Sequence, residues 1–453
     1  MRTVANDNDM TVSRTICLGF VAVILVGTLL LLMPFSVSSG AWNDPLVALF
    51  TATSAVCVTG HIVVDTGSHF SAWGHFLILT LIQIGGLGYM TATTFLLLLL
   101  GRKFGLRDKI ALQQALDRPG MQGGAQVIRS IVATTIIFEI TGVFLLLLVF
   151  APVYGLNRGL WLAIFHSISA WNNAGFSLFE DNLIGYQSSL LLNLVIPGLI
   201  IFGGIGYEVI FEMYLWLRDR LQRKSQRIVF SLNFKVAVST TLLLLGISTI
   251  AFFLTELRNP ETLGPMSWGT KLMTAWFQAV TPRTAGFNTI DIGEMTTAAL
   301  FITIALMFIG GSPGGTAGGI KTTTLRVLTS STKAILQGKE EVLMYERQMP
   351  ISVILKAVGV VFGSVTTVIL ATALIAITDP QVDFIQILFE VVSGFATVGL
   401  STGITADLSA PAKLTLIATM YIGRVGVLLL IGALLGDPRP SAVRYAEENL
   451  LVG

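Results

Sequence analysis

The chain has 453 residues, of which 53% are hydrophobic and 12% are charged, and its net charge at pH 7 is +2. A soluble domain carries about 25% charged residues, so this composition excludes an ordinary soluble protein, and the near-neutral charge does not suggest a nucleic-acid partner. The two cysteines and four histidines form no disulfide framework and no CxxC or HExxH pattern, which argues against metalloenzymes and thiol catalysts.

Long, continuous apolar runs account for the low charge content. LGFVAVILVGTLLLLMPF starts at Leu18, and VIRSIVATTIIFEITGVFLLLLVF starts at Val127. A helix needs about 20 such residues to cross a bilayer, and continuous runs argue against a β-barrel. The first run is too long for a cleaved signal peptide, so we expect it to remain in the protein. The predicted spanning segments are 15–34, 73–101, 127–151, 188–217, 230–257, 296–336, 351–378 and 410–436.

The charges in the connections predict the orientation. Basic stretches at 101–109, 218–227 and 326–356 alternate along the chain with acidic or neutral ones. Because Lys and Arg gather on the cytoplasmic side of membrane proteins, we expect the basic set inside. An even number of spans then puts both termini in the cytoplasm, in a multi-pass protein of the cell inner (plasma) membrane.

A shorter apolar piece lies between the two spans of each successive pair. These pieces have 11 to 13 residues, which is too short to cross a bilayer and fits a re-entrant half-helix. A glycine follows each piece within a few residues. The four pieces are DPLVALFTATSAV (44–56), GLWLAIFHSISAW (159–171), TKLMTAWFQAV (270–280) and DFIQILFEVVSGF (383–395).

These glycines recur together with their surroundings. They are Gly60, Gly175, Gly286 and Gly399, at intervals of 111 to 115 residues, in SAVCVTGH, SAWNNAGF, VTPRTAGF and SGFATVGL. A second glycine motif follows 24 to 28 residues later, as IGGLG (84–88), FGGIG (202–206), IGGSP (309–313) and IGRVG (422–426). Two landmarks at nearly constant offsets mark an internal repeat. For the glycine pairs of the second motif, we expect close packing against the half-helices.

The repeat predicts four units of one design, each made of a span, a half-helix, a glycine turn and a second span. Each unit crosses the membrane twice, so the units are parallel repeats about an axis normal to the membrane. The predicted fold is an all-α membrane protein with eight spanning helices and four re-entrant half-helices around a pseudo-four-fold central pore. The units are 1–110, 111–225, 226–345 with a broken second span, and 346–453 with the C-terminal tail.

Four such turns at one axis can bind a cation. The C-terminal ends of the half-helices carry partial negative charge, and a glycine lets φ become positive so that successive carbonyls face the axis. Rings of carbonyl oxygens then replace the hydration shell of an ion. A single glycine of this kind is more often a helix-packing residue, but the four-fold recurrence favours a selectivity filter.

At these motifs the chain resembles the Trk/Ktr/HKT superfamily of potassium transporters, in which four M1–P–M2 units surround one pore. The resemblance covers nearly the whole chain, and the short stretch before the first span makes it closest to the Ktr membrane subunit (KtrB-like). It implies potassium uptake through a channel-like pore and no enzymatic activity. The implied ion-binding residues of the filter are Val58, Thr59, Gly60, Asn173, Ala174, Gly175, Thr284, Ala285, Gly286, Thr397, Val398 and Gly399.

Ion selectivity stays open between two alternatives. In some members of the superfamily a serine replaces the first filter glycine and selectivity moves toward sodium, so Gly60 favours potassium here. Each turn has only one glycine, however, and we expect modest discrimination against sodium. The alternative is a sodium-selective or weakly selective monovalent cation transporter.

The resemblance also implies partners. These are a second copy in a membrane homodimer with one pore per protomer, and a cytosolic ring of nucleotide-binding regulatory subunits (KtrA-like) docked on the basic loops. Sodium coupling is compatible with the resemblance but has no signature in these residues. We expect no cofactor on this chain beyond potassium, and sodium if it is coupled.

The sixth predicted span is interrupted by GGSPGGTAGGIKTTT (310–324). Six glycines and a proline within ten residues cannot sustain a helix, and a plain kink would need only the proline. The resemblance implies an intramembrane gating loop under the filter. A phosphate-binding GxxxxGK loop is excluded because Ile320 separates Gly319 from Lys321. The implied gating residues are Gly310, Gly311, Ser312, Pro313, Gly314, Gly315, Thr316, Gly318, Gly319, Lys321 and Arg424.

Three basic residues fall at membrane depth, where ionisable groups are functional by default. We expect Arg424 to face the cavity below the filter, to hydrogen-bond carbonyls of the gating loop and to act as an electrostatic barrier. The alternative is a pair with a carboxylate such as Glu208. For Arg283 we expect a filter-supporting pair with Glu390, or an outward-facing charge. Lys321 belongs to the implied gating residues, and its individual role stays open. An intramembrane enzyme lacks a His, Asp or Cys cluster, and a scaffold would not need four glycine turns.

Overall fold

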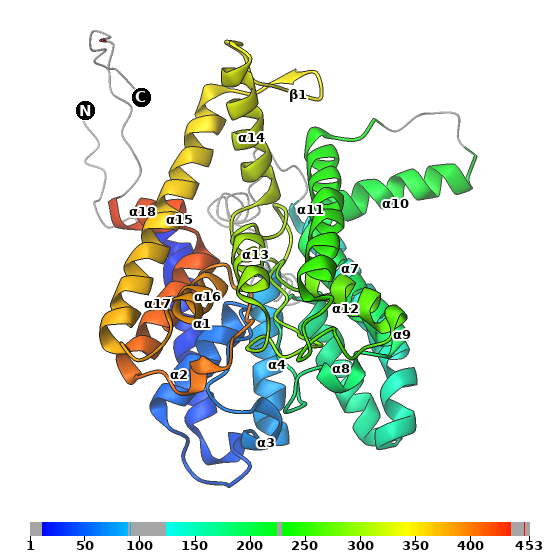
Figure 1. Ribbon diagram of the computed structural model, residues 1–453, viewed down its shortest axis with the longest axis vertical. Coiled ribbons are helices and arrows are strands. Elements are labelled where there is room, and N and C mark those ends of the chain that lie inside the picture. Colours follow the sequence, from blue (N-terminus) through cyan, green and yellow to red (C-terminus); the bar gives the residue numbers. More distant parts are fainter. Residues whose placement is uncertain (1–10, 89–90, 92–123, 224–228, 436–447, 449–453) are drawn as a thin grey trace.

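The computed structural model describes residues 11–88, 91, 124–223, 229–435 and 448. The described chain is almost entirely helical (Figure 1). Its only named strands are β1 (Leu343–Met344) and β2 (Arg347–Gln348), which form an antiparallel hairpin at one end of the molecule. The helix α3 (Thr66–His69) lies at the opposite end.

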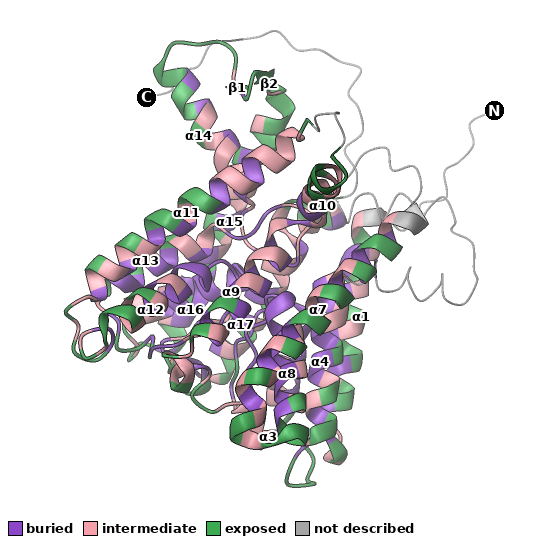
Figure 2. Ribbon diagram, turned by 90° about the vertical axis from the view of Figure 1, so that its right-hand side faces the viewer, coloured by how far each residue is buried: buried purple, intermediate pink, exposed green. Residues whose placement is uncertain are grey.

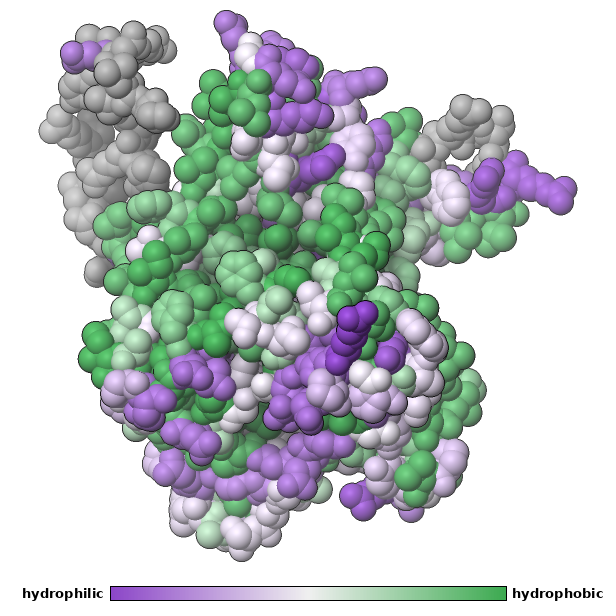
Figure 3. Space-filling view, viewed as in Figure 1, coloured by the Kyte–Doolittle hydropathy of each residue, from purple (hydrophilic) through white to green (hydrophobic). Residues whose placement is uncertain are grey.

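Four helices of the described chain are long and apolar enough to cross a membrane: α1 (Val12–Leu32), α7 (Gly124–Tyr154), α11 (Leu232–Glu256) and α15 (Ile351–Thr378). Each leaves large apolar side chains on its surface, such as Leu29, Ile137 and Phe362. On the face seen in Figure 3, apolar residues form a broad zone between polar residues at the top and in the lower part. This is the surface that a bilayer requires, and it confirms a multi-pass membrane protein.

Four shorter helices end at the predicted glycine turns. They are α2 (Pro45–Val56), α8 (Leu156–Trp171), α12 (Trp268–Val280) and α16 (Phe384–Phe395). Asp44 and Ser267 cap α2 and α12 by accepting hydrogen bonds from first-turn N–H groups. Lengths of 12 to 16 residues leave these helices too short to cross a bilayer, and we refer to these four as half-helices.

A third set of helices follows the turns: α4 (Ala72–Leu87), α9 (Leu190–Ile205), α13 (Thr297–Phe308) and α17 (Ala410–Val425). Each begins at a Ser or Thr cap whose hydroxyl accepts a hydrogen bond from the N–H group three residues later. The same local signal therefore starts the helix after each turn. We call these four helices the inner helices, and α1, α7, α11 and α15 the outer helices. The caps are Ser71, Ser189, Thr296 and Ser409.

The inner spans are not the continuous helices that were predicted. Segment 188–217 breaks at Gly206, where α9 and α10 (Tyr207–Leu221) meet at 105°, and 410–436 breaks at Gly426, where α17 and α18 (Val427–Leu435) meet at 93°. The last glycine of the second motif has φ of 100° and 91° at these two positions, a conformation that ends a right-handed helix. Gly88, with φ of 77°, ends α4 in the same way, and beyond it only Thr91 of the segment 73–101 is among the described residues.

The predicted break in the sixth span is present. The helix α13 ends at Phe308 and α14 (Thr322–Leu336) begins after an irregular segment. Backbone pairing holds the two ends of this segment together, because the Gly310 N–H donates to the Ile320 carbonyl at 2.9 Å. The helices α14 and α15 then extend together toward the β-hairpin (Figure 1).

The core lies where the half-helices converge, as the buried residues in the interior of Figure 2 show. Phe50, Phe165 and Phe389 are fully buried, each ten residues before a turn glycine. In α12 the buried ring is Phe277, whereas the preceding Trp276 is only half-buried. Burying one phenylalanine on each half-helix fixes the position of the helix end, and therefore of the turn, relative to its neighbours.

Two buried carboxylates each join the C-terminal end of an outer helix to the N-terminal cap of an inner helix. Glu256 accepts hydrogen bonds from the N–H and hydroxyl of Thr296 at 3.0 and 2.6 Å. Asp379 accepts hydrogen bonds from the N–H and hydroxyl of Ser409 at 2.8 and 2.7 Å. In each case the carboxylate holds the cap that starts the next inner helix.

Candidate functional site

The four predicted turns share one backbone conformation. We call 58–60, 173–175, 284–286 and 397–399 glycine turns 1 to 4. Each begins with a residue whose φ is positive, between 54° and 70°, and ends with a glycine whose φ is 70° to 92°. Non-glycine residues seldom adopt positive φ, and such strain persists only where the surrounding structure imposes it. The first residues are Val58, Asn173, Thr284 and Thr397.

The four glycines meet in a closed ring. A Cβ atom on Gly60 would overlap the carbonyl oxygen of Ala174, and one on Gly286 would overlap that of Val398. A Cβ on Gly175 would lie 2.8 Å from the Ala285 oxygen, and one on Gly399 would overlap the Thr59 oxygen. Each glycine thus faces the residue before the next glycine, in the order of turns 1, 2, 3, 4 and back to 1. Close approach, as well as positive φ, requires glycine at these positions.

Backbone carbonyls at the end of each half-helix hold the turn that follows it by accepting hydrogen bonds from an N–H group of the turn. The N–H groups of Thr59, Ala174 and Val398 donate to the carbonyl five residues earlier, each at 2.8 Å. Turn 3 differs, because the Ala285 N–H donates to the Thr281 carbonyl at 3.0 Å, only four residues back. In the described part of the chain, no hydrogen bond ends on the carbonyl oxygens of Thr59, Ala174, Ala285 or Val398.

The second glycine motif packs against the half-helices, as predicted. A Cβ on Gly85, Gly203 or Gly423 would overlap the carbonyl oxygen of Val56, Trp171 or Phe395, which is in each case four residues before a turn glycine. In the third copy of the motif, Gly310 instead meets the carbonyl of Gly318, within the irregular segment. Small residues therefore let the inner helices approach the turns to backbone contact.

The irregular segment between α13 and α14 packs against the turns and against α9. The Ser312 and Thr316 N–H groups donate to the carbonyls of Gly204 and Gly203, at 2.9 and 3.0 Å. The Thr316 hydroxyl lies 3.4 Å from Oδ1 of Asn173, which begins turn 2. A Cβ on Gly318 would overlap Oγ1 of Thr397, which begins turn 4. The segment is thus in direct contact with two of the four turns.

Arg424 binds this segment, as expected. Its Nη1 donates to the Thr316 carbonyl at 2.5 Å, and its Nη2 donates to the carbonyl of Gly85. Arg424, Tyr207, Gly314 and Gly318 all border a cavity of about 270 Å³. Glu208, the alternative partner, instead accepts a hydrogen bond from Asn233 at 2.8 Å. Lys321 donates to the Ala317 carbonyl at 2.6 Å and so also ties the segment to itself.

The expected pair between Arg283 and Glu390 is wrong. Arg283 is buried, with 8% of its surface exposed, so it is not an outward-facing charge either. Its Nη2 lies 3.4 Å from the Gly310 carbonyl at the start of the irregular segment. Glu390 has other partners, because its carboxylate already accepts hydrogen bonds from the segment after turn 4.

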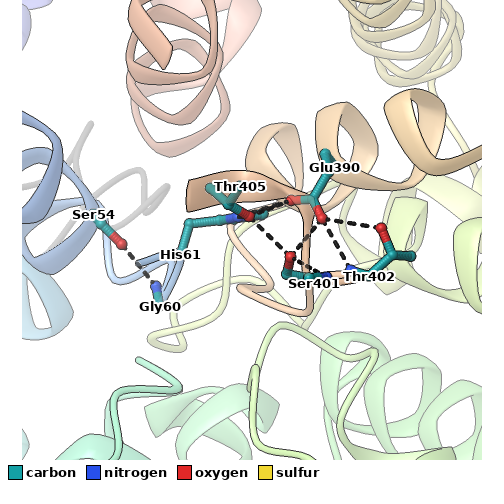
Figure 4. A network of polar contacts seen from close by, with 8 residues as sticks. Ser54, Gly60, His61, Glu390, Ser401, Thr402 and Thr405 are labelled. Carbon is teal, nitrogen blue, oxygen red and sulfur yellow. Dashed lines mark hydrogen bonds and ion pairs between the residues drawn. The ribbon is translucent and has the colours of Figure 1, made fainter. Parts of the chain in front are cut away.

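Two buried polar clusters beside the turns were not anticipated. His61, directly after Gly60, pairs with Glu390 at 3.1 Å (Figure 4). Asn172, directly before turn 2, donates from Nδ2 to Gln83 at 2.9 Å and to Glu139 at 3.3 Å. One signal was available for Glu139, since an ionisable residue inside a spanning segment indicates a functional site.

The sequence matches the model of the TrkH family, described as cation transport proteins, over residues 6–435. The chain belongs to this family. It is therefore a membrane cation transporter rather than an enzyme.

Individual relatives match nearly end to end. The Ktr system potassium uptake protein B of Bacillus subtilis (strain 168) is 40% identical over 98% of this chain and 97% of that protein. The protein of the same name from Vibrio alginolyticus is 38% identical over 97% and 94%. The potassium/sodium uptake protein NtpJ of Enterococcus hirae is 38% identical over 97% of both chains.

A solved structure shares the fold. The crystal structure of the potassium transporter TrkH from Vibrio parahaemolyticus matches with a TM-score of 0.74, over 97% of this chain and 87% of that chain. The sequence identity is 19%, so the likeness concerns the arrangement of the helices.

Proposed function

We propose that this protein takes up potassium through a pore whose selectivity filter consists of glycine turns 1 to 4. The closed ring of the four turn glycines carries the proposal. Beside it, the carbonyls of Thr59, Ala174, Ala285 and Val398 accept no hydrogen bond from the described residues. A buried carbonyl without a partner is unfavourable, and a dehydrated cation would satisfy all four.

The repeat boundaries 1–110, 111–225, 226–345 and 346–453 follow from the same proposal. Each unit would supply one outer helix, one half-helix, one turn and one inner helix around a pseudo-four-fold axis. The half-helices end at the turns, so the negative ends of their dipoles would add to the attraction for a cation. Irregular backbone at membrane depth is expected where it lines a pore.

Potassium is the favoured ion for two reasons. Two relatives at 38 to 40% identity are named potassium uptake proteins, and all four turns end in glycine, which keeps the carbonyl ring uniform. A second candidate is a less selective carrier of potassium and sodium, because a relative at 38% identity is named for both ions. Sodium could then be a coupled or a regulatory ion.

The segment 310–321 would act as the gate. It contacts turns 2 and 4, and Arg424 holds its Thr316 carbonyl. A guanidinium beside the ion path also raises an electrostatic barrier to a cation. Opening would require this segment to move. Because the segment is rich in glycine, its movement would disrupt little side-chain packing.

The surrounding assembly is proposed from the resemblance and the charge pattern. The protein would lie in the inner (plasma) membrane of the cell, with both termini in the cytoplasm. The basic residues Arg326, Lys333 and Lys339 border a cavity of about 370 Å³ near the β-hairpin, and would form part of the face that binds a nucleotide-dependent regulatory ring. The membrane unit would be a homodimer.

Uptake measurements test the proposal. The full chain would be expressed in a strain that lacks its own potassium uptake, and potassium influx would be followed with sodium and rubidium as competitors. We expect growth at low potassium and competition by rubidium well above that by sodium. Sodium influx comparable to potassium influx would favour the second candidate, and absence of influx of either ion would refute both.

A further inference from the structure

The carboxylate of Glu390 lies in the half-helix of the fourth unit and is fully buried. It accepts hydrogen bonds from the Ser401 hydroxyl at 2.6 Å, the Thr402 N–H at 2.9 Å and the Thr405 hydroxyl at 2.9 Å (Figure 4). These donors all belong to the segment that leaves turn 4. Glu390 therefore anchors the outgoing end of turn 4 to its own half-helix.

The same carboxylate also reaches turn 1. His61, with 1% of its side chain exposed, directly follows Gly60, and its Nδ1 lies 3.1 Å from Oε2 of Glu390. On the other side of this turn, the Gly60 N–H donates to the Ser54 hydroxyl at 3.1 Å (Figure 4). One carboxylate thus connects the outgoing ends of two turns that lie far apart in the sequence.

Turns 1 and 4 are direct neighbours in the glycine ring. A Cβ on Gly399 would overlap the Thr59 carbonyl oxygen and lie 2.9 Å from the Cα of Gly60. A relative shift of these two turns would therefore change the spacing between the Thr59 and Val398 carbonyls.

This connection makes the contact between turns 1 and 4 different from the other three contacts between neighbouring turns. The residue that follows the glycine is His61 in turn 1, but it is apolar and buried in the other three, namely Phe176, Phe287 and Leu400. Among the described residues, the buried contact between His61 and Glu390 is the only pairing of a basic with an acidic side chain that connects two turns. Removing one partner of such a pair leaves an uncompensated buried group and is strongly unfavourable.

We propose that His61 and Glu390 are a positioning pair that clamps turns 1 and 4 and thereby sets how strongly the pore favours potassium over sodium. The inference rests on the proposed filter. Neither side chain needs to contact the ion, because the pair acts through the carbonyls of Thr59 and Val398. A looser junction lets the carbonyl ring contract around the smaller sodium ion, so loss of the pair lowers discrimination.

Two substitutions and a matched control test this role. Glu390→Gln keeps the shape but points an NH2 group at hydrogen-bond donors, and His61→Leu installs the residue type found after turn 4. Asp379→Asn is the control, because Asp379 is also buried in the fourth unit and accepts hydrogen bonds from Ser409, but it touches no turn. All variants would be compared with the wild-type full chain for membrane insertion, apparent potassium affinity and inhibition by sodium.

The expected result is a change in the ratio of sodium to potassium affinity on the order of tenfold in both test variants, equivalent to about 1.4 kcal/mol, with the control unchanged. Inserted variants whose ratios match the control overturn the inference and leave the proposed function intact. Failure of both variants to insert, while the control inserts, also overturns it, because the pair would then serve folding alone. A wild-type chain without potassium uptake refutes the proposed function itself.

Discussion

Gly286→Ser is the substitution that most directly probes the glycine ring. Gly286 has φ of 73°, and placing a non-glycine residue in this region costs about 1–2 kcal/mol. The new Cβ would overlap the Val398 carbonyl oxygen and lie 3.0 Å from the Cα of Gly175. Overpacking of this kind adds about 1–3 kcal/mol.

Together these terms amount to roughly 2–5 kcal/mol, of which relaxation of the turns will absorb a part. Because 1.4 kcal/mol corresponds to a factor of ten in affinity, we expect the apparent potassium affinity to fall by about tenfold or more, with weaker discrimination against sodium. Potassium uptake by cells that lack other uptake systems measures both quantities, after normalisation to the protein inserted in the membrane.

Gly40→Ser is the matched control. Gly40 has φ of 68°, but a Cβ there would meet nothing within 4 Å. It therefore reproduces the backbone strain without the intrusion into the ring. If Gly286→Ser and Gly40→Ser show the same uptake kinetics, intrusion of the serine side chain into the ring has no effect on uptake beyond that of backbone strain. The assignment of turn 3 to the filter is then refuted.

Three further predictions concern the gate and stability. Shortening the segment 311–319 should raise potassium flux if it obstructs the pore, and a normally inserted variant without higher flux would contradict the gate. Arg424→Gln should also change flux because it weakens the bonds to Thr316 and Gly85. Arg218→Gln, which removes a surface pair with the adjacent Asp219, should leave flux unchanged, and equal flux in the two variants would exclude the role of Arg424. Burial alone would raise the pKa of Asp379, but hydrogen bonds from Ser409 and Thr378 outweigh it and lower that pKa. Its contribution to stability is therefore present above the unfolded pKa of about 3.9 and is lost as the pH falls through the folded value, so thermal unfolding of Asp379→Asn should depend less on pH in the acid range than that of the wild type; equal pH dependence would contradict this.

Local and repeated features could be inferred from the sequence. The lengths of the apolar runs separate the spanning helix α11 from the half-helix α12, because the bilayer thickness sets the length that a helix needs. The interruption at 310–321 could also be predicted, since glycines and proline disfavour a helix wherever they occur. Repetition at intervals of 111 to 115 residues singled out the turn glycines from the other glycines of the chain.

Features that depend on neighbouring helices needed the tertiary structure. Gly206 and Gly426 could have been packing residues within straight helices, and only their positive φ shows that α9 and α17 end there. The partner of Arg283 is a backbone carbonyl, which no residue pattern identifies. His61 and Glu390 belong to opposite ends of the chain, and a buried charge takes whichever partner the packing brings within reach. The sequence by itself therefore determined where the helices and the turns form, because those depend on local conformational preference and bilayer thickness, whereas the partners that hold the turns were decided by the folded arrangement.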